Sequence, residues 1–119
     1  REKDQNNIVM DEPGFYEEVA RLAVKDLERD PVSFLPEKQS SIDRNMLKQK
    51  LEEVISYMLD NEFEKLCNAM YRLDVSEKLF HRALNETPKD VVPAVIAELV
   101  IEREMQKVKT RRLYKNGKL

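Results

Sequence analysis

Apolar residues recur at three- and four-residue steps along most of the 119-residue chain, which is the period of amphipathic helices. The first such stretch covers residues 14–29. Asp11 can cap it and Pro13 fits its opening turn. Asp30-Pro31 is expected to end it, because the residue before a proline avoids the helical conformation. Its apolar stripe consists of Phe15, Val19, Leu22, Ala23 and Leu27.

The middle of the chain predicts two further helices. The second begins at Ser40 or Ser41, because Ser40 followed by Asp43 is a capping pattern. Asp60-Asn61 offers a stop, and a third helix follows it; neither residue breaks a helix decisively, so one long helix is the alternative. The stripe of the second helix consists of Leu47, Leu51, Val54, Ile55, Met58 and Leu59, and that of the third consists of Phe63, Leu66, Cys67, Met70 and Leu73.

Asp74 and Glu77 form the start signal of a fourth helix over about 75–85. Its apolar stripe consists of Val75, Leu79, Phe80, Ala83 and Leu84. With the third helix, this fourth helix makes a segment, residues 63–85, that resembles a helix-turn-helix, which implies binding of a nucleic acid by the second helix of the pair. The turn position where glycine is usual holds Leu73 or Asp74, and the face that would read the bases is nearly neutral. An ordinary helical hairpin is therefore the alternative. That face consists of Ser76, Glu77, Lys78, His81 and Arg82.

The last helix is predicted to be the longest. It starts at Asp90, keeps Pro93 in its first turn and can run to about Tyr114. Between residues 91 and 100 it is apolar around much of its circumference. Such a helix is central in a bundle or is packed by a second chain.

The scarcity of glycine decides the fold class. Gly14 and Gly117 are the only two, and both lie near the ends. A sheet protein of this size needs tight turns with positive φ, which glycine supplies most readily. We therefore predict an all-α fold, a compact bundle of four to five helices with a long C-terminal helix.

The chain is predicted to hold one domain, because 119 residues suffice for a single core. Residues 1–12 form a polar lead-in, residues 13–115 the helical domain and residues 116–119 a tail. The connector 31–39 contains Val32, Phe34 and Leu35, which we expect to lie against the core.

Candidate catalytic chemistry is sparse. Cys67 and His81 are the only cysteine and the only histidine, and we expect the first in the core and the second at its edge. A cysteine–histidine nucleophile would also need an orienting group and a cleft. Two such side chains are too few for a structural zinc site, and the chain has no phosphate-binding glycine loop. We therefore expect no enzyme activity, no metal and no cofactor.

The cysteine count and the apolar runs also bear on the compartment. One cysteine excludes an internal disulfide and fits a reducing environment. No apolar run has the length of a membrane span, and the polar first residues do not resemble a signal peptide. We expect a cytoplasmic protein with no membrane contact.

Charge is divided unevenly along the chain. The formal net charge is −2, yet the stretch from Met105 to Leu119 contains six basic residues and no acidic one. The basic residues of this C-terminal segment are Lys107, Lys109, Arg111, Arg112, Lys115 and Lys118. We predict that they contact a protein partner, or a second copy in a homodimer, with a nucleic acid as the alternative. A simpler interpretation is that these cations only stabilise the C-terminal end of the helix dipole.

Overall fold

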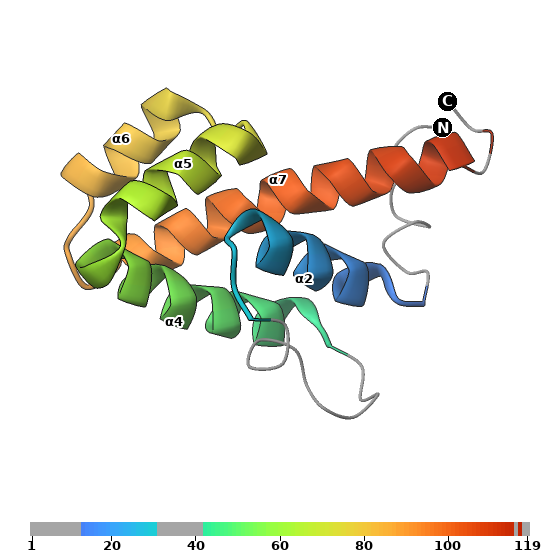
Figure 1. The fold of residues 1–119 in the computed structure, drawn as a ribbon, viewed down its shortest axis with the longest axis horizontal. Coiled ribbons are helices and arrows are strands. Elements are labelled where there is room, and N and C mark those ends of the chain that lie inside the picture. Colours follow the sequence, from blue (N-terminus) through green and yellow to red (C-terminus); the bar gives the residue numbers. More distant parts are fainter. Residues whose placement is uncertain (1–12, 31–41, 116, 118–119) are drawn as a thin grey trace.

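The computed structural model describes residues 13–30, 42–115 and 117 of the chain. Over these residues it contains five helices and no strand (Figure 1). The helices are α2 (Phe15–Asp26), α4 (Arg44–Asn61), α5 (Phe63–Leu73), α6 (Glu77–Asn85) and α7 (Val92–Lys115). The predicted all-α fold with a long C-terminal helix is confirmed, and the chain does form two helices around Asp60-Asn61.

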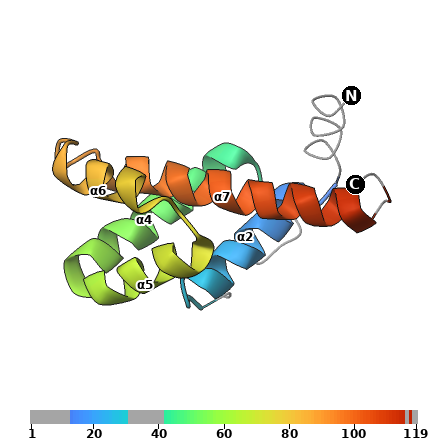
Figure 2. The same cartoon turned by 90° about the horizontal axis from the view of Figure 1, so that it is seen from above.

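Helix α7 is the centre of the bundle. It packs against each of the other four helices, and it crosses the whole molecule in both views (Figures 1 and 2). Buried side chains follow it on several faces, from Val92 near its start to Leu113 near its end. This explains the wide apolar surface between residues 91 and 100, which faces several neighbours at once.

Helix α7 begins at Val92 rather than at the predicted Asp90, and α2 and α4 have N-caps other than those predicted. The N-cap of α2 is Gly14, with φ of 78°, while Asp11 lies outside the described residues. The N-cap of α4 is Asp43, whose carboxylate accepts a hydrogen bond from the Met46 N–H at 2.8 Å. Its side chain reaches the first turn directly, so the helix needs no earlier cap. Ser40 and Ser41 lie outside the described residues, as do the connector 31–39 and the lead-in 1–12.

Helix α2 ends before the predicted stop at Asp30-Pro31. The N–H of Arg29 binds the carbonyl of Val24 at 2.9 Å, and the N–H of Glu28 binds the carbonyl of Lys25 at 3.1 Å. These two bonds form a Schellman motif, which closes the last turn with Glu28 at a φ of 56°. Glycine would fit this position without strain, but here a glutamate occupies it.

The same motif ends α5, which corrects the role predicted for Asp74. Asp74 is not the cap of the fourth helix: it has φ of 63°, and it terminates α5. The N–H of Val75 returns to the carbonyl of Met70 at 3.0 Å. Ser76 then caps α6, because its Oγ accepts a hydrogen bond from the N–H of Leu79 at 3.3 Å.

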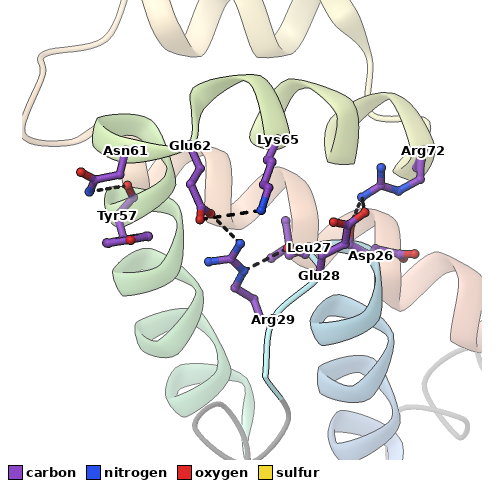
Figure 3. Close-up of polar contacts among 9 residues, drawn as sticks. All are labelled: Asp26, Leu27, Glu28, Arg29, Tyr57, Asn61, Glu62, Lys65 and Arg72. Atoms are coloured by element: carbon purple, nitrogen blue, oxygen red, sulfur yellow. Dashed lines mark hydrogen bonds and ion pairs between the residues drawn. The ribbon is translucent and has the colours of Figure 1, made fainter.

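The break between α4 and α5 is a single residue, Glu62, with φ of −141° and ψ of 49°. Its carboxylate forms an ion pair with Arg29 at 2.6 Å and lies 4.0 Å from the ammonium of Lys65 (Figure 3). Arg29 also donates to the carbonyl of Leu27 at 3.0 Å. The end of α2 is therefore fastened to the bend between α4 and α5.

Charged side chains join the helices across their edges, which accounts for part of the 37% charged composition. Arg44 of α4 binds Glu98 of α7 and lies 3.2 Å from Glu102. The hydrogen bond from Arg44 holds the pKa of Glu98 below its usual range, against the opposing effect of burial. These ion pairs are part-exposed, so each adds little to stability.

Two side chains from the predicted apolar stripes are exposed instead. Phe63 is 46% exposed and Leu79 is 43% exposed. The short helices α5 and α6 have only part of their apolar surface covered by α7, so these positions remain at the surface. Other positions of the same stripes, such as Leu66, Leu73 and Phe80, are buried as predicted.

Candidate functional site

A groove lies between α5 and α6. Its volume is about 560 Å³, and its apolar lining includes Met70, Val75, Phe80 and Leu84. The tight turn described above brings the two helices together at one end and leaves their outward faces open along the rest of their length. We call this feature the α5–α6 groove.

Aromatic side chains stand exposed beside this groove. Tyr71 is 81% exposed and Phe63 is 46% exposed, and both line the groove. Exposed apolar groups that gather around a concavity are typical of a contact site for another molecule. Met70 also lines the groove, and methionine side chains can adjust to differently shaped occupants.

The carboxylates that line the groove give its lining a negative charge. Among the described residues, its charged lining consists of Asp74 and Glu77, without a lysine or arginine. Asp74 makes one long contact, 3.5 Å, with Arg103, and its side chain is 86% exposed. The opening of the groove is therefore apolar and acidic, a combination that suits an apolar ligand with positive charges beside it.

Cys67 and His81 both line this groove, so the structure brings the two candidate catalytic residues to one place. Cys67 is half-buried rather than in the core, and His81 is exposed rather than at the core's edge. Burial raises the pKa of the Cys67 thiol, and the nearby charge of Glu64 raises it further. A thiol held in its neutral form is a poor nucleophile, which argues against the cysteine–histidine mechanism.

The segment 63–85 does adopt two helices joined by a short turn, as the resemblance to a helix-turn-helix implied. Asp74 supplies the left-handed conformation that glycine usually provides in such turns. The outward residues of α6 include Glu77, Lys78, His81 and Arg82, all exposed and close to neutral in sum. Such a face offers little attraction to phosphates.

The basic C-terminal segment lies along α2, and several of its cations are paired there. Arg112 lies 2.9 Å and Arg111 lies 3.4 Å from the carboxylate of Glu18. Arg112 also stacks over the ring of Phe15, with 5.6 Å between its guanidinium carbon and the ring centre. The sequence could not reveal this pairing, because it depends on which helix lies beside the end of α7.

The remaining basic residues of this segment differ in their surroundings. Lys107 lies 3.5 Å from Asp26 of α2. Lys109 is half-buried and Lys115 is exposed, and neither forms an ion pair with a residue in the described ranges. Lys118 lies outside the described residues. Lys107, Arg111 and Arg112 of the basic segment therefore form ion pairs with carboxylates of the same chain.

A buried pair of carboxyl groups lies where α2 meets α7. Glu104 is fully buried, and its carboxyl group is in hydrogen-bonding range of the Asp26 carboxylate. This pair was not predicted from the sequence. A signal was present, because Glu104 falls between Ile101, Met105 and Val108 in the apolar stripe of the last helix.

Two further features are absent from the part of the chain that the structure describes. It contains no group of three or more histidine, cysteine, aspartate or glutamate side chains placed to hold a metal ion. None of its helices combines the length and apolar character that crossing a bilayer requires.

Comparisons of the chain with models of protein families, with curated proteins and with solved structures found no match. The geometry of the described residues is therefore the basis for a functional proposal.

Proposed function

We propose that this chain is a non-enzymatic, cytoplasmic protein-interaction module, and that its contact site is the α5–α6 groove. The occupant is a helical segment of a partner protein, apolar on one face and flanked by lysine or arginine. The observation that carries the proposal is the groove itself: its volume is about 560 Å³, it is apolar within, and the described residues that line it include acidic but not basic side chains.

Amphipathic helices commonly bind in such grooves through a few apolar side chains spaced one turn apart. The exposed rings of Phe63 and Tyr71 offer the large contact areas that dominate binding energies at interfaces. Asp74 and Glu77 would select a partner with positive flanks and would speed its approach.

The non-enzymatic part of the proposal rests on the side chains of the groove. Cys67 has a raised pKa and lies beside Glu64, a negative charge that disfavours the thiolate. The single cysteine also supports the cytoplasmic assignment, because it suits a reducing compartment.

There are two alternatives to a foreign protein partner in the groove. In a homodimer, the occupant would be a second copy, whose α7 ends with the exposed side chains Tyr114 and Lys115. Nucleic-acid binding by the basic segment has less support, because Glu18 and Asp26 already pair with Arg111, Arg112 and Lys107.

Cys67 provides a reporter for the groove, since it is the only cysteine and lines it. The probe is a synthetic amphipathic helix of leucine, phenylalanine and lysine, and the control peptide carries glutamate in place of each lysine. We expect the basic peptide to slow alkylation of Cys67 by iodoacetamide in a saturable way, and the acidic peptide to leave the rate unchanged.

A matched pair of variants tests the location. Tyr71→Glu places a charge at the groove, whereas Tyr114→Glu places one at a similarly exposed tyrosine at the end of α7. The first substitution should abolish protection of Cys67 and the second should preserve it. Equal protection by both peptides, or full protection in Tyr71→Glu, would refute the proposal.

Light scattering at several concentrations decides between a foreign partner and a second copy. A monomer agrees with the proposal. An oligomer that Tyr71→Glu disperses would replace the foreign partner with a second copy. An oligomer that only Tyr114→Glu disperses would move the contact site to the end of α7.

A further inference from the structure

Glu104 presents an unusual arrangement for a protein interior. It has no exposed surface, and no described residue donates a hydrogen bond to either of its carboxyl oxygens. Asp26 approaches it from the last turn of α2, and the Oδ2 atom of Asp26 is likewise buried without a hydrogen-bond donor, with an ion pair to Lys107 at 3.5 Å. Buried polar atoms are nearly always hydrogen-bonded, so these three oxygens require a physical explanation.

A shared proton supplies that explanation. Ionised carboxylates only accept hydrogen bonds, so two of them side by side would repel each other and leave their oxygens unsatisfied. If Glu104 is protonated, its hydroxyl can donate to the Asp26 carboxylate and satisfy both groups. The position of Asp26 adds a reason, because the C-terminal end of α2 already carries a partial negative charge.

We propose that Glu104 and Asp26 share one proton and form a proton-dependent latch, which holds the last turn of α2 against α7 while the proton is bound and releases it when the proton is lost. This inference concerns regulation of the fold and does not depend on the proposed function of the groove.

The charged groups around the latch lie on two helices, α7 and α5. Lys107 of α7 lies 3.5 Å from Asp26 Oδ2, and Arg103 of α7 also acts on Glu104 by charge. Arg72 of α5 donates to the Asp26 carbonyl at 2.6 Å (Figure 3). Burial raises the pKa of Glu104 to about 9, and the bond to Asp26 and its charge contribute in the same direction, while Lys107 and Arg103 oppose them.

The latch responds to pH well below that value. When α2 is released, Glu104 meets water and titrates near its ordinary pKa of 4.5. Between the two pKa values, closing the latch takes up one proton, so the closed state loses stability as pH rises and the loss is complete only above the higher value. The equilibrium constant for release therefore grows roughly tenfold per pH unit across the neutral range.

Release would also affect α5, because Arg72 bridges the two helices. Its guanidinium donates to the backbone carbonyl of Asp26 and lies 3.3 Å from the carboxylate of Glu28. Helix α5 would lose these contacts when the last turn of α2 moves away. The latch thus connects a protonation event to a helix that forms one wall of the groove.

Hydrogen exchange tests the latch in the intact chain. Amide protection in α2, corrected for the intrinsic effect of pH on exchange, should fall roughly tenfold per unit between pH 6 and 8 in the wild type. Glu104→Gln keeps the shape and can still donate to Asp26, but it has no proton to lose. Its α2 protection should not change with pH, and a slope equal to that of the wild type would overturn the proposal.

Carbon-13 NMR of the glutamate carboxyl groups gives a direct readout, with Glu104→Gln used to assign the signal. We expect Glu104 to titrate with a midpoint at about 9. In Asp26→Asn the midpoint should fall, because the neighbouring negative charge is gone. A wild-type midpoint near 4.5 would refute the shared proton, even if Asp26→Asn does not fold.

Discussion

Arg103 of α7 donates a hydrogen bond from Nε to the carbonyl oxygen of Leu73 at 2.9 Å, and so caps the C-terminal end of α5. The last carbonyls of a helix lack partners within the helix, and a cation is favoured there by the helix dipole. The contact orients α5 on α7 and thereby one wall of the α5–α6 groove. Arg72 of α5 likewise donates a hydrogen bond to the carbonyl of Asp26, the last residue of α2.

Arg103→Ala should lower the free energy of unfolding by about 1–2 kcal/mol, because the Leu73 carbonyl loses a charged donor in a part-buried place. Urea unfolding measures the change. Arg103→Lys is the control for charge: it keeps the cation but lacks the Nε donor, so it should recover only part of the loss. Full recovery by lysine would show that charge, rather than the directed hydrogen bond, is responsible.

Two helix ends use non-glycine residues with positive φ, and replacing them should stabilise the protein. Glu28 has φ of 56° and Asp74 has φ of 63°. Glycine removes the Cβ strain at such positions, and a gain of about 1 kcal/mol is expected for Glu28→Gly. Asp74→Gly should gain less, because aspartate tolerates this conformation better than glutamate does.

Thermal or urea unfolding of Glu28→Gly and Asp74→Gly measures both gains and shows whether the first is the larger. The ion pair of Glu28 with Arg72 is half-exposed, at 3.3 Å, so its loss should subtract little. If both substitutions destabilise the protein, Cβ strain at Glu28 and Asp74 does not limit its stability.

Glu18→Gln should loosen the C-terminal end of α7 from α2. The carboxylate of Glu18 accepts a hydrogen bond from Arg112 Nε at 3.0 Å and lies 3.4 Å from Arg111. The pair with Arg112 is mostly shielded from water, and its loss should cost about 1 kcal/mol. Glu53→Gln removes an equal charge from an exposed position and should be neutral.

This substitution also tests the predicted role of the basic segment. If the arginines are occupied by Glu18, their release should raise affinity for a mixed-sequence nucleic acid at low salt, measured by fluorescence anisotropy. A wild-type protein that binds as tightly as Glu18→Gln, with the same salt dependence, would show that the pairing does not limit these cations.

Cys67 should react slowly. Because burial raises the pKa of its thiol, less thiolate is present at a given pH, and the pH of half-maximal alkylation should lie above that of an unstructured cysteine peptide. Rates measured from pH 7 to 10, in the folded protein and in denaturant, test this. A folded-state rate exceeding that of the peptide would revive the nucleophile hypothesis.

The fold class could be read from the sequence because it follows from local rules. The three- and four-residue spacing of apolar side chains and the lack of glycine between Gly14 and Gly117 act within single segments. Helix ends were predicted less well. Asp74 looked like a cap for the next helix, but the Schellman bonds and the capping by Arg103 make it the end of α5.

The candidate site was decided by tertiary structure. Periodicity placed Phe63 and Leu79 in apolar stripes, yet only the packing of α5 and α6 on α7 determined which stripe positions stayed exposed. The sequence by itself established a basic C-terminal segment. Its pairing with Glu18, and the meeting of Glu104 with Asp26, depend on α2 lying beside α7, because electrostatic energies depend on distances in space rather than on separation along the chain.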